Sequence, residues 1–316
     1  MKISLLEPLS VAEEIIEEYG QKLRLEGHEF TYYREKTTDV EELKKRSAEQ
    51  DIVMIANNPY PDEVICSADR LKMIAVAFTG IDHVGKAAKE KGIMICNCAG
   101  YSDQTVAELV IGMVLSLYRK IPLANRAVRN GGTSVGFIGR EIAGKQVGII
   151  GCGKIGYRTA KLFQAFGAKI LVNELAERTE WKEEGLLFAD LDTLMRESDI
   201  ISIHLPLIDS TRGFISREKI ALMKRDAILI NCARGPIVDN YALAQALKAG
   251  KIAGAGVDVF DVEPPIPAEY DLMHVDRVIV TPHIAFFSQE SMLRRVEIAF
   301  ANVDAFLGGR PQNVCG

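Results

Sequence analysis

Short runs of Val- and Ile-rich apolar residues, each followed by a stretch with helical periodicity, recur along almost the whole chain. Such alternation is typical of parallel β-strands whose connecting helices cover both faces of a sheet. With 316 residues, the chain is long enough for two domains of ordinary size. The sequence therefore predicts an α/β protein with two Rossmann-like, doubly wound parallel sheets.

The apolar runs fall into two series separated by a long helical segment. Helical periodicity is predicted over residues 102–120, which are apolar almost all round and should be covered by a domain interface or a subunit partner. Another helix is predicted to begin at the capping-box pair Ser10 and Glu13, and a last one over residues 288–307. The first series has five candidate strands (2–6, 30–33, 51–56, 71–77 and 93–96) and the second has six (146–150, 169–173, 199–205, 227–231, 253–259 and 277–281).

Charge and cysteine usage exclude several classes of function. Lys and Arg number 38 against 43 Asp and Glu, a net charge of −5 without a basic stripe, so neither nucleic acid nor a membrane surface is an expected partner. The longest apolar stretch, residues 109–117, is much shorter than the ~20 residues of a membrane span. The N-terminus resembles no signal peptide, and six cysteines without a CxxC pair predict reduced thiols, no metal and a cytoplasmic protein.

A glycine-rich turn directly follows the first strand of the second series and opens a helix. In this context the pattern Gly151, Gly153, Gly156 predicts a dinucleotide site, with Lys154 and Ile155 in the same turn. Gly151 would form the tight turn, Gly153 would let a pyrophosphate approach the backbone, and Gly156 would let helix and strand pack closely. The alternative is a tight turn without a ligand.

Glu174 ends the next strand, 18 positions after Gly156, close to the ~20-residue offset at which an acidic side chain binds the adenosine ribose. This position favours NAD over NADP, because a 2′-phosphate would meet a like charge. Arg178 nearby would partly compensate that charge, and a solvated surface glutamate remains an alternative.

Ligands of open parallel sheets bind beyond the carboxyl ends of the strands. An arginine, an acid and a histidine are predicted to converge there. The alternative is that these residues anchor loops through salt bridges. His283 is the candidate proton donor and acceptor, Glu263 would pair with its ring, and Arg234 would hold a substrate carboxylate. His83 is the main rival of His283 for the proton-transfer role. The residues predicted to contact the cofactor are Gly151, Gly153, Lys154, Ile155, Gly156, Glu174, His204, Pro206, Cys232, Ala233, Asp258 and His283.

The ordered set GCGKIG, Glu174, HLPL, NCARGPIVD, GVDVFDVEPP and TPHIAFF resembles the D-isomer-specific 2-hydroxyacid dehydrogenase family over nearly the whole chain. The resemblance implies that Arg234, Glu263 and His283 are catalytic and that Asp258 holds the nicotinamide carboxamide. It also implies a homodimer with a discontinuous substrate domain, residues 1–100 and 285–316, and an NAD-binding domain at 101–284.

The first series matches the same family. AFTGIDHV is similar to the loop whose backbone amides bind the substrate carboxylate, which implies this role for Thr79 and Gly80. Tyr101 lies in the segment NCAGYSDQTVAE and is predicted, with Tyr60 and Phe286, to border the substrate. Because the loop 57–60 has no Lys or Arg, a small unphosphorylated 2-oxo acid is favoured.

The expected reaction is therefore the NADH-dependent reduction of a 2-oxo acid. Two alternatives stay open at this point. One is an NAD(H)-sensing protein similar to the co-repressors of the same family, because fold alone does not imply catalysis. The other is a redox sensor acting through Cys152, whose thiol would lie at a helix N-terminus.

Overall fold

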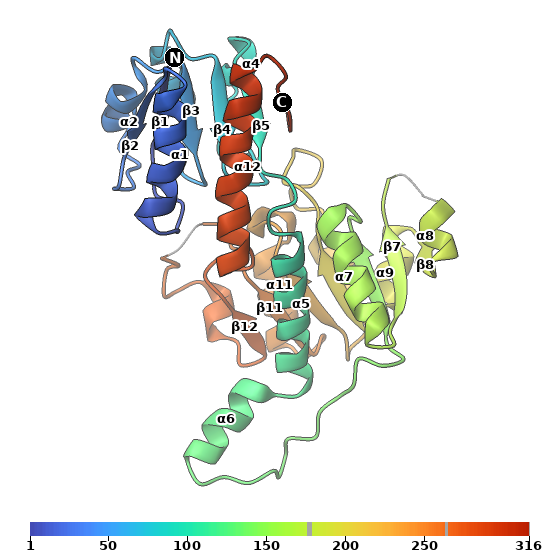
Figure 1. The fold of residues 1–316 in the computed structure, drawn as a ribbon. Helices are drawn as coiled ribbons and strands as arrows, with labels where there is room; N and C mark the ends of the chain where they lie inside the picture. The colour runs from blue at the N-terminus through green and yellow to red at the C-terminus, as the bar shows by residue number, and fades with distance from the viewer. Residues whose placement is uncertain (176–178, 263–264, 316) are drawn as a thin grey trace. The chain divides into compact units, whose positions relative to one another are not determined.

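The chain folds into two compact units, each built on its own parallel sheet (Figure 1). The computed structural model describes residues 1–175, 179–262 and 265–315. Unit 1 consists of Met1–Ser102 and Phe287–Gly316, and unit 2 of Asp103–Phe286. The chain passes between the units at residues 102–103 and again at residues 286–287.

Unit 1 contains a five-stranded sheet in the order β2-β1-β3-β4-β5, with every pair parallel. All residues of β3 and β4 are buried, as expected for apolar strands covered on both faces. Each strand falls at a predicted position to within two or three residues. Their bounds are β1 Lys2–Leu5, β2 Glu29–Tyr32, β3 Ile52–Ile55, β4 Met73–Val76 and β5 Met94–Asn97.

Helices α1 (Glu13–Leu25) and α12 (Gln289–Leu307) lie side by side in unit 1 (Figure 1), where Tyr19 and Phe300 stack with ring centroids 4.6 Å apart. The return of the chain to unit 1 is thereby fixed by aromatic packing. The other helices of this unit are α2 (Val40–Ser47), α3 (Asp62–Ser67) and α4 (Ala87–Glu90).

The predicted capping box at the start of α1 is wrong. The helix begins at Glu13, but its N-cap is Ala12, which makes no side-chain hydrogen bond. Ser10 instead adopts a left-handed backbone with φ of 56°, so the chain turns before the helix starts. A capping box does form in α12, between Ser288 and Ser291.

Unit 2 contains a seven-stranded parallel sheet in the order β8-β7-β6-β9-β10-β11-β12. The direction of winding reverses between β6 and β9, which is where doubly wound sheets bind ligands. The predicted number of six strands is wrong because β8 is a three-residue edge strand that contains no Val or Ile and exposes Leu187. The bounds are β6 Gln146–Ile150, β7 Lys169–Asn173, β8 Leu186–Phe188, β9 Ile200–Ile203, β10 Ile228–Asn231, β11 Gly254–Val257 and β12 Val278–Val280.

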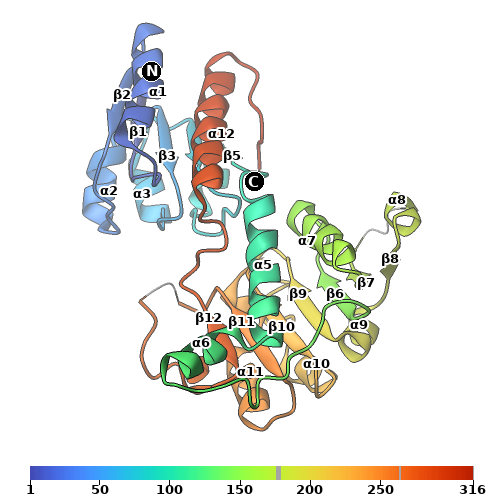
Figure 2. The same ribbon diagram turned by 60° about the horizontal axis from the view of Figure 1, so that its bottom comes forward.

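Two helical layers enclose this sheet (Figures 1 and 2). Helix α5 packs closely on β11, because a Cβ at Gly256 would lie only 2.9 Å from the sulfur of Met113. The apolar helix predicted over 102–120 is thus covered on that side by its own unit. One layer contains α5 (Asp103–Tyr118) and α7 (Lys154–Ala165), and the other α9 (Leu191–Glu197), α10 (Arg217–Ala221) and α11 (Asn240–Lys248).

Shorter elements complete unit 2: helices α6 (Ile121–Arg129) and α8 (Thr179–Glu183), and two 3₁₀ turns at Gly235–Ile237 and Asp271–His274. Among the helices that the structure describes, none combines the length and apolar character needed to cross a membrane.

Candidate active site

The glycine turn after β6 leaves an open helix N-terminus. Gly151 has a left-handed φ of 83°, and a Cβ at Gly156 would lie 2.1 Å from the Gly151 carbonyl oxygen. Both positions therefore require glycine. A Cβ at Gly153 would meet no atom within 4 Å, and α7 begins at Lys154 without a side-chain cap or an acidic residue in its first turn. These features suit a diphosphate bound at the N-terminus of the helix.

Glu174 lies beside this turn. Its Oε2 accepts a hydrogen bond from the Cys152 amide at 2.7 Å, and its Oε1 accepts one from the Leu175 amide at 2.8 Å. The structure thus brings the predicted ribose-binding carboxylate to the glycine turn and fixes its orientation. Arg178, the nearby cation noted in the sequence, lies outside the described residues.

The ends of β10, β11 and β12 are tied together in a row by backbone hydrogen bonds. The Asp258 amide donates to the Asn231 carbonyl at 3.0 Å, and the His283 amide donates to the Asp258 carbonyl at 2.8 Å. Arg234 follows three residues after β10. The structure therefore places Arg234, Asp258 and His283 at three neighbouring strand ends on one edge of the sheet.

The backbone that carries Arg234 is held tightly. The buried Asn231 side chain donates to the Arg234 carbonyl at 2.9 Å and accepts from the Ala233 amide at 3.0 Å. A Cβ at Gly235 would lie 1.8 Å from the Phe260 carbonyl oxygen, so this turn fits directly against the segment after β11. The Arg234 side chain is partly exposed, and its Nη1 donates to the Ala233 carbonyl at 2.8 Å.

His283 stands in an unusual backbone conformation, with a left-handed φ of 55° in a residue other than glycine. Its imidazole ring is partly exposed and meets the ring of Phe286 edge-on, with centroids 5.4 Å apart and planes at 90°. An aromatic edge contact of this kind restricts the ring's orientation. His283 is thus held on one side by packing.

Asp258 is fully buried, and both of its carboxylate oxygens face the loop that carries His283. Oδ1 accepts from the Thr281 hydroxyl and from the Ile284 amide at 2.9 Å, and Oδ2 accepts from the Ala285 amide at 2.8 Å. Burial raises the pKa of Asp258, while these hydrogen bonds and the His283 charge lower it.

Glu263, the predicted partner of the His283 ring, lies outside the described residues. Its pairing with the imidazole stays a prediction from the sequence.

His204 and Pro206 follow β9 on the same edge of the sheet. The His204 Nε2 lies 2.9 Å from the Ser202 hydroxyl oxygen, and burial lowers the pKa of His204 to about 3. A ring that stays neutral in this way is poorly suited to donate protons near neutral pH. His204 is therefore a lining residue at this edge.

Two cysteines near the site are buried. The Cys232 thiol packs against the Met113 sulfur at 3.8 Å, and burial raises its pKa well above the usual value. A cofactor contact at Cys232 would therefore come from its backbone. Cys152 is 1% exposed and belongs to the hydrophobic core of unit 2. An inaccessible thiol argues against the redox-sensor hypothesis.

In unit 1, Thr79 and Gly80 follow β4 at its carboxyl end and are partly exposed. The Asn97 side chain donates to the Thr79 carbonyl at 2.8 Å and fixes this turn. Tyr101 is only 1% exposed and packs against Phe78 with centroids 6.0 Å apart. Its side chain therefore forms part of the core of unit 1.

Tyr60 is also a core residue. It is fully buried, its hydroxyl donates to the Ser47 hydroxyl at 2.9 Å, and burial raises its pKa to about 12. The aromatic ring of Tyr60 therefore turns into the core, and its contact with the substrate stays a prediction from the sequence. The rival histidine, His83, packs its ring edge-on against Phe78 at 6.4 Å.

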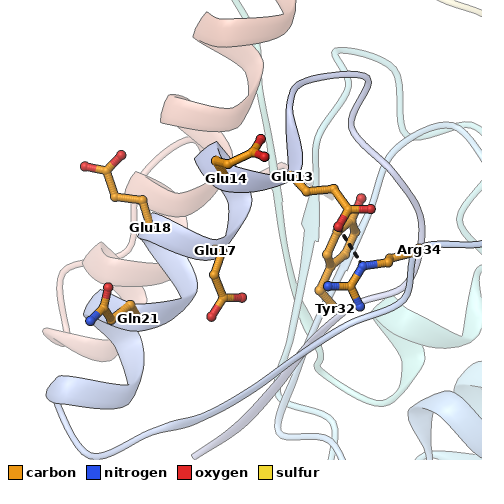
Figure 3. Close-up of a pocket in the computed structure, with 7 residues that line it drawn as sticks. All are labelled: Glu13, Glu14, Glu17, Glu18, Gln21, Tyr32 and Arg34. Carbon is orange, nitrogen blue, oxygen red and sulfur yellow. Dashed lines mark hydrogen bonds and ion pairs between the residues drawn. The ribbon is translucent and has the colours of Figure 1, made fainter.

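A hollow on the surface of unit 1 (Figure 3) has a different character. Four glutamates of α1 are among its lining residues, and the Arg34 Nε lies 2.8 Å from the Glu13 Oε2. It contains none of the residues predicted to bind cofactor or substrate. The lining residues are Glu13, Glu14, Glu17, Glu18, Gln21, Tyr32 and Arg34.

Sequence reasoning assigned no role to two residues that shape the site, Asn231 and Thr281. Both lie where a strand ends and are the first residues of the quoted motifs NCARGPIVD and TPHIAFF. A hydrogen-bonding side chain at such a place, between an apolar run and a functional turn, is the signal that points to a role in positioning the loop.

Comparison with known proteins gives consistent matches. The family model described as "D-isomer specific 2-hydroxyacid dehydrogenase, NAD binding domain" matches residues 111–285. The chain is 41% identical over 300 residues to the glycerate dehydrogenase of Methylorubrum extorquens, with 91% of this chain and 92% of that protein covered.

Two solved structures resemble the whole chain. A D-lactate dehydrogenase from Aquifex aeolicus complexed with NAD and lactic acid has a TM-score of 0.85 and 31% identity, covering 98% of this chain and 96% of the other. An acyclic imino acid reductase (Bsp5) in complex with NADPH and D-Arg has a TM-score of 0.90 and 30% identity, covering all of both chains.

Proposed function

Because this chain belongs to the family of D-isomer-specific 2-hydroxyacid dehydrogenases, we propose that it transfers a hydride between NAD(H) and a small 2-oxo or 2-hydroxy acid. The observation that carries this proposal is the row of strand ends that presents Arg234 and His283 on one edge of unit 2. A guanidinium and an imidazole are the groups that bind a carboxylate and exchange a proton with an alcohol.

In the direction of reduction, the planar fork of Arg234 binds the substrate carboxylate. The backbone amides of Thr79 and Gly80 are further proposed to bind a substrate carboxylate. When bound, NADH would supply the hydride that C2 accepts. His283 gives its proton to the carbonyl oxygen, and Glu263 favours the protonated ring. In the reverse direction, His283 accepts the hydroxyl proton.

The glycine turn is the proposed site of the cofactor diphosphate, and the open space above Gly153 supports this assignment. Glu174 accepts hydrogen bonds from the ribose hydroxyls. The other proposed cofactor contacts are Lys154, Ile155, His204, Pro206, Cys232, Ala233, Asp258 and His283.

We further propose that NAD is preferred over NADP. The Glu174 carboxylate, anchored by two backbone amides, would repel a 2′-phosphate. In Glu174→Ala, the ratio of kcat/KM for NADH to that for NADPH should fall about tenfold or more, since a charge-assisted hydrogen bond is lost. Glu180→Ala, on the exposed helix α8, is the control. An unchanged ratio in Glu174→Ala would remove the ribose role.

A panel of 2-oxo acids followed by NADH absorbance tests the proposed reaction. We expect turnover with at least one of glyoxylate, pyruvate and hydroxypyruvate, and a weaker reaction with 3-phosphohydroxypyruvate, because the loop 57–60 carries no cation for a phosphate. NADH binding without consumption would favour the NAD(H)-sensing alternative. Preference for the phosphorylated acid would overturn the proposed substrate class.

We also propose a homodimer that uses the segment around α6. Every residue of α6 is at least partly exposed, including Ile121, Leu123 and Val128, and the following loop exposes Val135 and Ile138 almost completely. Apolar side chains gathered in this way are typical of an interface. Wild type should sediment as a dimer, and a double variant of Val135→Lys and Ile138→Lys should shift toward monomer. A monomeric wild type would contradict this.

A further inference from the structure

The loop that presents His283 is held by a set of contacts that the proposed chemistry does not itself use. The set consists of the Asp258 carboxylate, the Thr281 hydroxyl and the backbone amides of Ile284 and Ala285, and is here named the Asp258 clasp. Three donors meet one buried carboxylate, from positions on both sides of His283 in the chain.

The clasp acts on a residue whose backbone is strained. A non-glycine residue at φ of 55° is disfavoured because its Cβ crowds the carbonyl oxygen that follows. Such a conformation persists only where several surrounding contacts hold it in place. The His283 amide is bound by the Asp258 and Thr281 carbonyls, and the two amides that follow are bound by the Asp258 carboxylate.

The Thr281 hydroxyl has a particular part in the clasp. Oδ1 of Asp258 accepts both this hydroxyl and the Ile284 amide, so the hydroxyl fixes the rotation of the carboxylate that the amides require. Asp258 is fully buried, so water does not replace a donor that is removed. Loss of the Thr281 hydroxyl should therefore weaken the hydrogen bonds that hold Ile284 and Ala285, which follow His283.

We propose that Thr281 and Asp258 are positioning residues that hold the His283 imidazole in its reactive place by stabilising this left-handed backbone. The inference rests on the proposed function. It predicts that loss of the Thr281 hydroxyl slows the proton-transfer step and leaves the binding of NADH and of the 2-oxo acid carboxylate unchanged.

The test compares Thr281→Val with Thr281→Ser in the full-length protein. Val keeps the shape but removes the donor, and Ser keeps the donor. In Thr281→Val, kcat with hydroxypyruvate should fall about 10- to 100-fold, the loss that a misplaced catalytic group causes. KM and the Kd of NADH should be unchanged. Thr281→Ser should restore most of kcat.

Thr193→Val is a matched control, because the Thr193 hydroxyl also donates to an aspartate, Asp190, at the start of α9. It should leave kcat unchanged. Unaltered kcat in Thr281→Val, equal losses in the Val and Ser variants, or a parallel loss of NADH affinity would overturn the inference.

Failure of the proposed function is a separate outcome, seen as a wild type that reduces none of the 2-oxo acids. In that case NMR of the histidine rings still tests the clasp, since the chain has only five histidines. Thr281→Val should move the His283 ring signal, identified by its absence in His283→Ala. An unmoved signal would overturn the inference.

Discussion

The first strand–helix connection of each unit occupies the same place in a parallel sheet, yet the two connections have opposite chemistry. In unit 2, three residues separate β6 from α7, and the first turn of α7 contains no acidic residue. In unit 1, seven residues separate β1 from α1, and the first turn of α1 carries Glu13 and Glu14.

The longer connection of unit 1 also contains a buried carboxylate. Oε1 of Glu7 accepts the Ala56 amide at 2.7 Å and the Asn58 amide at 3.2 Å, and burial raises the pKa of Glu7. Negative charge at this position repels phosphate, whereas the glycine turn of unit 2 attracts it. Sheet topology therefore sets where a ligand can bind, and the residues of one short connection decide which ligand.

The largest expected effect is on kcat, and it distinguishes substitution of His283 in unit 2 from substitution of His83 in unit 1. His283→Ala should lower kcat by about 10²–10⁴-fold, as expected for loss of a general acid and base. His83→Ala should retain kcat within a few-fold of wild type, because its ring packs against Phe78. Steady-state rates of NADH oxidation measure both. The reverse order of effects would place proton transfer in unit 1.

A second prediction tests the glycine turn of unit 2. Gly153→Ala adds a Cβ to open space, so the thermal unfolding temperature should stay near that of wild type. NADH should nevertheless bind about 10- to 100-fold more weakly, because the methyl group enters the space assigned to the diphosphate and overpacks it. Titration calorimetry and thermal unfolding give the two quantities.

Gly156→Ala is the contrasting variant, since its Cβ would lie 2.1 Å from a backbone oxygen. It should lower both the unfolding temperature and the NADH affinity. If Gly153→Ala bound NADH as tightly as wild type, the open N-terminus of α7 would not be the feature that distinguishes the two units.

The smallest expected effect concerns pH and His204. Its pKa of about 3 in the folded protein lies below the ordinary value of 6.5 that the unfolded chain should have. Between these values the unfolded chain binds a proton that the folded one does not, so the stability of unit 2 should fall as pH falls. The slope should be at most about 1.4 kcal/mol per pH unit.

Urea unfolding followed by the fluorescence of Trp181, the single tryptophan of the chain, reports unit 2. His204→Gln should flatten the pH dependence between the two pKa values. Equal slopes in wild type and His204→Gln would show that the ring is not desolvated as described.

Much of this architecture could be predicted from the sequence. Apolar Val- and Ile-rich runs located eleven of the described strands, because buried parallel strands are apolar on both faces. The edge strand β8 was missed, since an edge strand with an exposed Leu187 needs no such run. The capping box at Ser10 failed because a local pattern does not reveal that the chain turns through a left-handed residue there.

The candidate site, too, could be predicted only in part from the sequence. Arg234 and His283 could be found from residue type and place, because carboxyl ends of neighbouring parallel strands share one edge. The burial of Tyr60 and the contacts of Asp258 with Thr281 depend on side-chain packing between segments distant in sequence. Residue type alone does not determine such packing.

Analysis of the product formed from hydroxypyruvate and NADH tests the central claim most directly. A reductase whose Arg234 and His283 fix the substrate on one edge of the sheet should deliver the hydride to a single face of C2. We predict consumption of one NADH for each product molecule and formation of D-glycerate alone. L-glycerate, a racemic product or no NADH consumption with any of the small 2-oxo acids would contradict the account.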